Sequence, residues 1–129
     1  MAVGKMSTPL ARVRGLGAAR SGTEQFWRQR LTAVANLPLT IAFVFIVVAL
    51  LGRNHAAVVQ ILGSPLVAVI LLLFIISITT HMRIGMQVII EDYVHDEGTK
   101  LVLVMANTFF VVAVGLASAF ALLMLSFKV

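Results

Sequence analysis

The chain has 129 residues, of which 60% are hydrophobic and only 12% are charged, and its mean hydropathy is +1.05. Soluble globular chains are about 45–50% apolar and about 25% charged, so this composition excludes an ordinary soluble domain and a disordered chain. It indicates a membrane protein whose apolar surface is partly covered by lipid. The sequence contains no cysteine, which excludes a disulfide framework, a thiolate zinc site and an iron–sulfur cluster held by this chain.

Basic residues gather near the start of the chain. Six of the ten Lys and Arg residues lie within residues 1–30, where Glu24 is the only acidic residue. Because basic flanks stay on the cytoplasmic side of a membrane, we expect the N-terminus to be inside. A net charge of +5 also suits nucleic acid, but few aromatic residues accompany the basic ones, so we expect no nucleic-acid partner. We expect residues 1–22 to form a mobile basic tail, although their lack of Asp and Glu also fits a transit peptide.

Three apolar runs follow this tail, and the second is too long for one crossing. Residues 56–90 are almost continuously apolar, whereas a membrane helix needs about 17–25 residues. A break is expected at Ser64, which suits a helix N-cap, and Pro65, which suits the first helical position. The sequence therefore predicts an all-α membrane protein with a 23–129 anchor domain: spans at residues 31–51, 65–90 and 101–127, and a short interfacial helix at residues 56–62.

The third span carries a line of small residues, Ala113, Ala117 and Ala121. Small residues at this spacing let helices approach closely, although the span is also rich in alanine throughout. Under either interpretation, we expect one face of this helix to meet another helix. Three spans would place the C-terminus outside, and the turn after the second span inside.

His81 and Arg83 lie inside the second span, where ionisable residues are costly and are functional candidates. At about 100° per residue, His81, Gly85, Val88 and Asp92 fall on one stripe. A neutral imidazole can bind haem iron through one nitrogen while a hydrogen bond orients the other, and Gly85 would leave room for the macrocycle. The alternative is that His81 only hydrogen-bonds a neighbouring helix.

The other polar residues have simpler interpretations when each is taken alone. Tyr93 suits an interfacial anchor and Asp92 a helix-end charge in water. His55 and His95 are expected in solvated loops. Arg83 points away from the His81 stripe, so we expect it to snorkel inward or to pair with a headgroup or a partner.

Residues 81–93 closely resemble the second-helix signature of the smaller membrane anchor subunit of succinate dehydrogenase. That family carries a His, a Gly four residues later, and an Asp-Tyr pair eleven and twelve residues later. Residues 30–33, Arg-Leu-Thr-Ala, also resemble the family's Arg-x-Thr-Ala entry to the first helix. The chain departs from the family at Arg28 and Arg83, where less polar residues are expected.

The resemblance implies a role for each matching residue. His81 would be an axial ligand of a b-type haem shared with the larger anchor subunit. Tyr93 would contact the carbonyl oxygen of ubiquinone, and Asp92 would help to shape and protonate that site. Arg30 would lie near the haem propionates or the quinone site.

The function expected from the resemblance is that of a non-catalytic anchor subunit of succinate:ubiquinone oxidoreductase. Its partners would be membrane lipids, the larger cytochrome b anchor, the iron–sulfur subunit and the flavoprotein subunit. We expect a bacterial inner membrane rather than a mitochondrial one. One alternative is a small transporter protomer, but its path would need polar residues in both leaflets, and here they gather in the inner half. The other alternative is a non-redox scaffold in which His81 is only structural.

Overall fold

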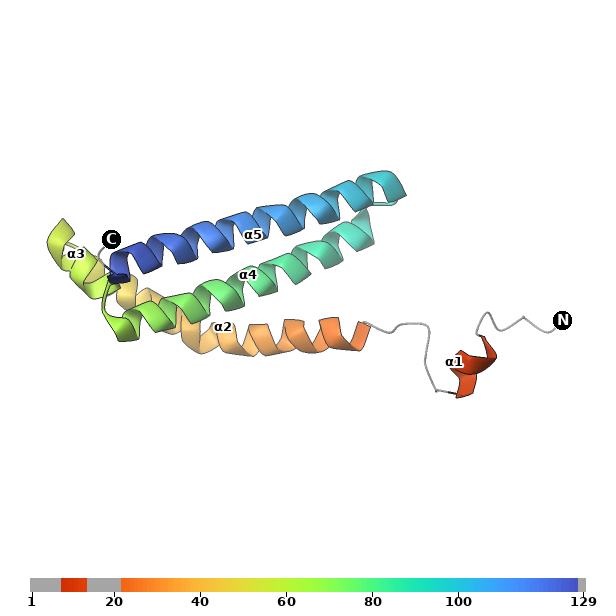
Figure 1. Ribbon diagram of the computed structural model, residues 1–129, viewed down its shortest axis with the longest axis horizontal. Coiled ribbons are helices and arrows are strands. Elements are labelled where there is room, and N and C mark those ends of the chain that lie inside the picture. The colour runs from red at the N-terminus through yellow and green to blue at the C-terminus, as the bar shows by residue number, and fades with distance from the viewer. Residues whose placement is uncertain (1–7, 14–21, 128–129) are drawn as a thin grey trace.

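Three long helices run along the molecule in the computed structural model, which describes residues 8–13 and 22–127 (Figure 1). Each of the three is long and apolar enough to cross a membrane. Within the described residues there is no strand, so the predicted all-α, three-span architecture is confirmed. The helices are α1 (Pro9–Val13), α2 (Gly22–Leu50), α3 (His55–Leu62), α4 (Pro65–Tyr93) and α5 (Glu97–Phe127).

The long helices extend beyond the apolar runs at the end of the molecule where α2 begins. Helix α2 starts at Gly22 rather than at residue 31, and α4 ends at Tyr93 rather than at residue 90. The added residues include Gln, Glu and Arg, which are good helix formers, so the hydrogen-bonded helix continues after the apolar pattern stops. Most of the predicted mobile tail lies outside the described residues, apart from α1 and the first residue of α2.

Helix α5 begins just after Asp96, before the apolar run that marked the predicted span. The carboxylate of Asp96 accepts a hydrogen bond from the backbone N–H of Thr99 at 2.7 Å, as an N-cap side chain does. The pKa of Asp96 is lowered below its ordinary value because Thr99 donates hydrogen bonds to the carboxylate. The larger effect comes from the Thr99 hydroxyl and the smaller from its backbone N–H. The α4–α5 turn therefore has a charged cap, as expected for a segment in water.

The predicted interfacial helix is α3, which packs across the end of the bundle. The side chain of Asn54 caps it by accepting from the N–H of Ala57 at 2.9 Å. His55 is exposed, but it is the first residue of α3. The prediction that it lies in a loop was wrong because Asn54 caps the helix one residue earlier. Ser64 and Pro65 occupy the predicted first positions of α4, but the Ser64 hydroxyl donates to the carbonyl of Ile61 instead of capping the helix.

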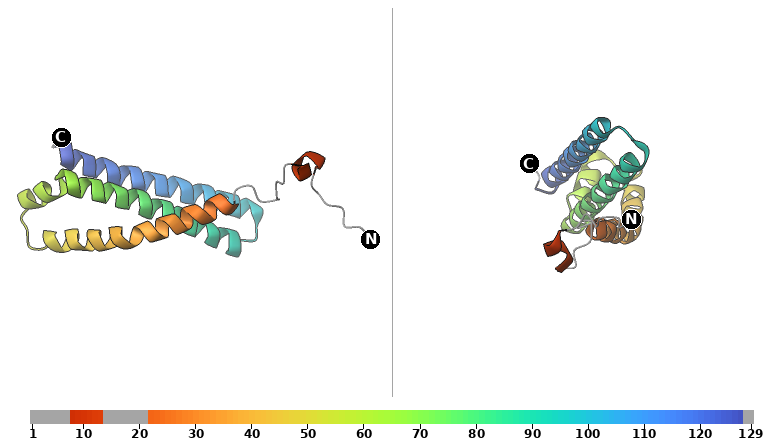
Figure 2. Two further views of the ribbon diagram at one scale, coloured as in Figure 1. Left: turned by 90° about the horizontal axis from the view of Figure 1, so that it is seen from below. Right: turned by 90° about the vertical axis from the view of Figure 1, so that its right-hand side faces the viewer.

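Helix α4 is the central helix of the bundle. It contacts both α2 and α5, whereas α2 and α5 make no contact with each other (Figure 2). Few apolar side chains are buried between the helices: Ala68, Leu71, Ile84, Ile90, Val111 and Leu122. Most of the apolar surface is therefore left for lipid or for other subunits.

One face of α5 packs on α4, but it is not the predicted alanine line. Val111 is buried there, and a Cβ added to Gly115 would lie 3.5 Å from Cγ2 of Thr79 on α4. Ala113, Ala117 and Ala121 are all exposed. The expectation that α5 meets another helix is confirmed, while the alanine line remains exposed within this chain.

Candidate functional site

The site forms along the seam between α2 and α4, where His81 meets Thr32. The Nδ1 atom of His81 lies 3.2 Å from Oγ1 of Thr32, and the imidazole is half-buried. One turn earlier on α4, the buried Ser77 donates its hydroxyl to the backbone carbonyl of Thr32 at 3.4 Å. Thr32 is thus held by α4 at two points, and the predicted stripe faces α2.

The hydrogen bonds of Thr32 favour one tautomer of His81. The Thr32 hydroxyl has one hydrogen, which it gives to the backbone carbonyls of Arg28 and Gln29, at 2.8 Å and 3.1 Å. While its hydrogen points at these carbonyls, the hydroxyl accepts from His81. In this arrangement neutral His81 donates from Nδ1, and the lone pair of Nε2 is free to bind a metal.

Further polar side chains of α2 continue this seam, and the predicted site omitted them. A Cβ added to Gly85 would lie 3.5 Å from Nε2 of Gln29. This amide is therefore the nearest side chain to the space that Gly85 was expected to leave for haem. Oε1 of Gln29 and Oδ1 of Asn36 are buried and lack a hydrogen-bond partner among the described residues. A signal was present in the sequence, because Gln25, Gln29, Thr32 and Asn36 repeat the spacing of the His81 stripe.

These residues fit haem better than a metal ion bound by protein side chains alone. Among the described residues, no group of three or more His, Asp and Glu is placed to hold a metal. A haem needs only an axial ligand from the chain, because its ring supplies four nitrogens. His81 offers one such ligand, and Gly85 has no side chain one turn away.

Asp92 and Tyr93 lie at the end of α4, away from His81. Eleven residues separate Asp92 from His81, which is about 16 Å along the helix. Both residues are exposed, and Tyr93 is 77% exposed. Asp92 lies on the side of α4 that carries the His81 stripe, whereas Tyr93, one residue later, points about 120° away from His81 around the helix. The chain encloses neither residue, so any pocket around them needs walls from elsewhere.

Arg30 borders the same stripe from α2. Its guanidinium lies 4.6 Å from the ring centroid of Phe26, a cation–π contact. Arg30 also lines a groove of about 560 Å³ that includes Gln29 and Val88. Arg30 is therefore placed beside the seam rather than in contact with His81.

The two unexpected arginines, Arg28 on α2 and Arg83 on α4, line a separate groove over another side of α4. Arg28 pairs with Glu24 at 2.6 Å, but both side chains are about two-thirds exposed, so this pair adds little stability. Arg83 is exposed and has no ion pair among the described residues. Its backbone carbonyl accepts a hydrogen bond from Nδ2 of Asn107 at 3.0 Å, which ties α5 to α4.

Comparison with known proteins decides the family. The sequence profile of succinate dehydrogenase/fumarate reductase transmembrane subunits matches residues 4–115. The chain belongs to this family. The family membership inferred from residues 81–93 is therefore confirmed. No solved structure matches the chain significantly.

Three curated relatives carry the same kind of name. The succinate dehydrogenase hydrophobic membrane anchor subunit of Paracoccus denitrificans is 32% identical over 115 residues, covering 89% of this chain and 88% of the relative. The succinate dehydrogenase membrane anchor subunit of Reclinomonas americana is 35% identical over 86 residues, covering 64% and 72%. The hydrophobic membrane anchor subunit of Rickettsia bellii is 26% identical over 101 residues, covering 78% and 81%.

Proposed function

We propose that this chain is the smaller membrane anchor of a succinate:ubiquinone oxidoreductase and supplies one axial ligand of a haem b. The observation that carries the proposal is the contact between Thr32 and His81. If the Thr32 hydroxyl accepts a hydrogen bond from Nδ1–H of His81, the imidazole presents Nε2 as a ligand in a fixed orientation. The second axial ligand would come from the larger anchor subunit. A bound haem b supplies a one-electron carrier inside the membrane.

The chain would act only as part of a complex, without catalysing a reaction alone. It has no cysteine and therefore no iron–sulfur cluster of its own, so electrons must arrive from an iron–sulfur subunit that a flavoprotein subunit reduces. The charged ends of α2, α4 and α5 lie together at one end of the molecule and would face these subunits (Figure 1). Relatives from Paracoccus and Rickettsia favour a bacterial inner membrane.

Tyr93 and Asp92 would form this chain's part of the ubiquinone site. Reduction of ubiquinone to ubiquinol takes two electrons, from the iron–sulfur subunit, and two protons. The Tyr93 hydroxyl can donate a hydrogen bond to a quinone carbonyl, and Asp92 can pass protons from water to the reduced oxygens. The exposure of both residues in this chain leaves room for walls from the partner subunits.

Replacing His81 tests the haem role. We expect the complex purified with His81→Ala to lose the b-type bands of its reduced visible spectrum. The matched control is His95→Ala, since His95 is exposed in the α4–α5 turn, and this variant should keep the bands. Unchanged bands in His81→Ala would contradict the haem role and leave the scaffold alternative.

A second variant separates the quinone role from anchoring. Tyr93→Phe removes only the hydroxyl, so ubiquinone reduction should fall about 10-fold or more, in line with loss of a positioned hydrogen-bonding group. Succinate oxidation with a soluble artificial acceptor should stay unchanged, because that reaction bypasses the membrane site. If the Tyr93→Phe complex reduced ubiquinone at the wild-type rate, Tyr93 would not be part of the proposed site.

A further inference from the structure

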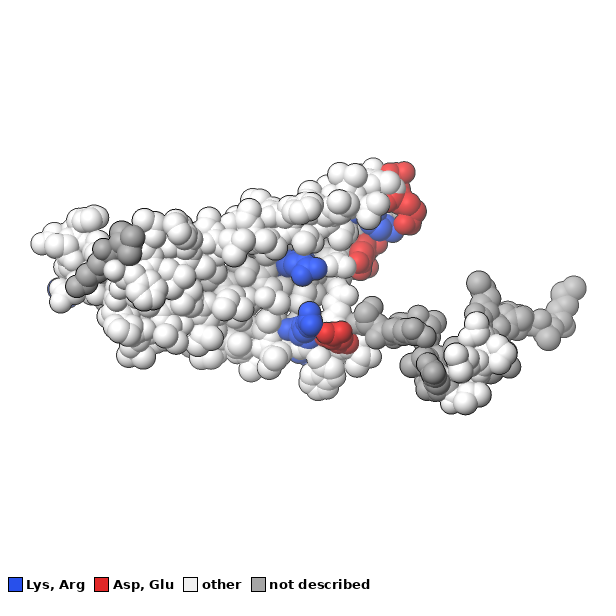
Figure 3. Space-filling model, viewed as in Figure 1, with Lys and Arg blue, Asp and Glu red and all other residues white. Residues whose placement is uncertain are grey.

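A groove of about 520 Å³ runs over α4 between α2 and α5, where these two outer helices do not touch. Its end nearer the α4–α5 turn is polar and includes Glu24, Arg28, Arg83 and Gln87, with a net charge of +1. Figure 3 shows basic side chains facing each other on this side of the molecule, next to a broad white surface. Away from them the lining is mostly apolar: Ile75, Ile76, Val111, Val112, Leu116 and Ala119. Thr79 and Thr80 also line this part, and their hydroxyls donate to backbone carbonyls of their own helix.

One positive charge in this groove lacks a partner. Arg28 is engaged by Glu24 at 2.6 Å, while Arg83 has no carboxylate partner among the described residues. Arg83 lies ten residues before the end of α4 at Tyr93, about 15 Å along the helix. A guanidinium at such a depth in a membrane helix must reach the interface or meet an anion.

We propose that this groove binds one anionic phospholipid from the inner leaflet. The phosphate would lie at the guanidinium of Arg83, whose planar fork matches phosphate oxygens. One acyl chain would follow the apolar lining from Arg83 towards Ile75, about 12 Å along α4. Basic pockets between membrane helices on the cytoplasmic side bind anionic headgroups in this manner.

The position of the groove on α4 separates it from the proposed haem and quinone sites. Arg83 is two residues after His81, so it points about 160° away from it around the helix. The groove therefore opens on the opposite flank from the stripe assigned to haem. A quinone headgroup carries no charge and would leave Arg83 unpaired, whereas a phosphate neutralises it. The proposal does not depend on haem or quinone binding by this chain.

The test measures the phospholipid that remains with the intact complex. Wild type, Arg83→Gln, Arg83→Lys and Arg53→Gln complexes are purified in mild detergent, delipidated, and incubated with phosphatidylglycerol or with phosphatidylcholine. Bound lipid is then counted by native mass spectrometry. We expect Arg83→Gln to bind phosphatidylglycerol about fivefold more weakly than wild type, which corresponds to about 1 kcal/mol for one cation. Arg83→Lys keeps the charge but loses the planar fork, so it should bind phosphatidylglycerol at a level between wild type and Arg83→Gln. The control Arg53→Gln, at a distant exposed arginine, should bind it as wild type does.

Two further variants keep the test decisive if Arg83→Gln fails to assemble. Ala119→Phe fills the apolar end of the groove and leaves Arg83 in place, so it should also weaken phosphatidylglycerol binding. A photo-crosslinking residue at the exposed Leu116 should attach to a phospholipid. Equal phosphatidylglycerol binding by wild type, Arg83→Gln and Ala119→Phe would overturn the proposal. So would equal affinity of wild type for phosphatidylcholine, or crosslinking of Leu116 to another subunit.

Discussion

At the scale of single residues, Thr32 is predicted to position His81. Thr32→Val keeps the shape of the side chain but removes the oxygen that accepts the Nδ1 proton of His81. A buried N–H left without its acceptor costs about 1–3 kcal/mol, and an imidazole without this hydrogen bond is a less basic ligand. A less basic ligand stabilises ferric haem less, so we expect the haem midpoint potential to rise by some tens of millivolts. Redox titration of the purified complex measures it.

The control for this prediction is Thr32→Ser, which restores an acceptor at the same place. Its haem potential should return towards the wild-type value. A merely structural role for Thr32 would change the stability of the complex and leave the haem potential where it was. Equal potentials in wild type and Thr32→Val would therefore contradict the positioning role.

The sequence predicts half of the seam between α2 and α4. The stripe of His81, Gly85 and Asp92 stands out because ionisable and small residues are rare inside an apolar run. Thr32 and Gln29 lie near the polar entry of α2, where polar side chains are expected to face water, so neither stands out by itself. Their role depends on the register of α2 against α4, and helical periodicity alone does not set the register between two helices.

At the scale of helices, Gly63 is predicted to be the tightest packing position in the connection to α4. A Cβ at Gly63 would lie 2.8 Å from the carbonyl oxygen of Leu125 and 2.9 Å from that of Val59. Both atoms belong to the backbone, so Gly63→Ala must displace the end of α3 or of α5. We expect the variant to lose about 1–3 kcal/mol of stability, the usual cost of overpacking. Thermal inactivation of the detergent-solubilised complex measures the loss.

Gly115→Ala is the matched control on α5. The nearest atom to its added Cβ would be Cγ2 of the Thr79 side chain at 3.5 Å, which is ordinary van der Waals contact. Alanine also favours the helix over glycine by about 1 kcal/mol, so this variant should be at least as stable as wild type. If Gly63→Ala were equally stable, the close approach of α3 and α5 would be contradicted.

The helix boundaries were predicted well where the sequence carries a breaking signal and less well elsewhere. Ser64 and Pro65 mark the start of α4 because proline fits the first turn of a helix. Pro38 lies inside α2 without ending it, as the predicted 31–51 span required. At the charged ends the predicted bounds followed the apolar pattern alone, whereas α2 continues back to Gly22 through residues that suit a helix as well as a loop.

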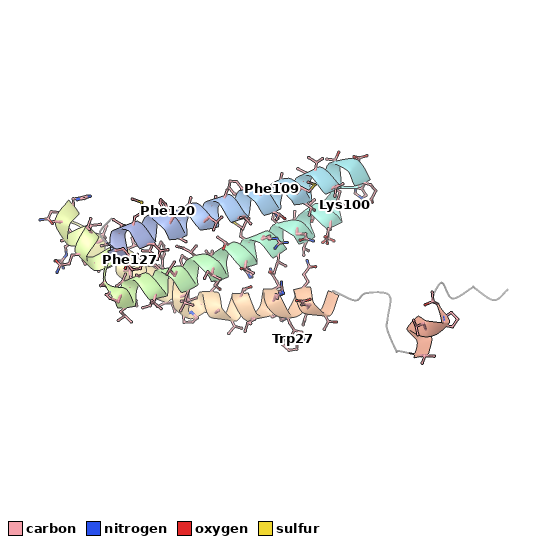
Figure 4. All side chains as sticks on the ribbon, viewed as in Figure 1. Trp27, Lys100, Phe109, Phe120 and Phe127 are labelled. Carbon is pink, nitrogen blue, oxygen red and sulfur yellow. The ribbon has the colours of Figure 1, made fainter. Side chains whose placement is uncertain are left out.

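At the scale of the whole molecule, the number of spans was predictable but their arrangement was not. Three apolar runs and one break determine three long helices. Nothing in hydropathy says that α4 lies between α2 and α5, or that these two helices stay apart. The labelled aromatic side chains of α5 in Figure 4, Phe109, Phe120 and Phe127, are exposed. In a membrane, apolar side chains face lipid as readily as a neighbouring helix, so apolarity does not say which face is packed.

The orientation of the whole bundle leads to the last prediction. The α4–α5 turn carries His95 and lies at the same end as the start of α2, whereas Arg53 lies at the opposite end beside α3 (Figure 1). The basic residues before α2 predict that this first end is inside. Because the chain contains no cysteine, a single introduced cysteine reports its own position. A membrane-impermeant maleimide should label Arg53→Cys in intact cells, and His95→Cys only in inside-out vesicles washed free of the soluble subunits. Labelling of His95→Cys in intact cells would reverse the orientation and place Asp92 and Tyr93 on the side away from the soluble electron donor.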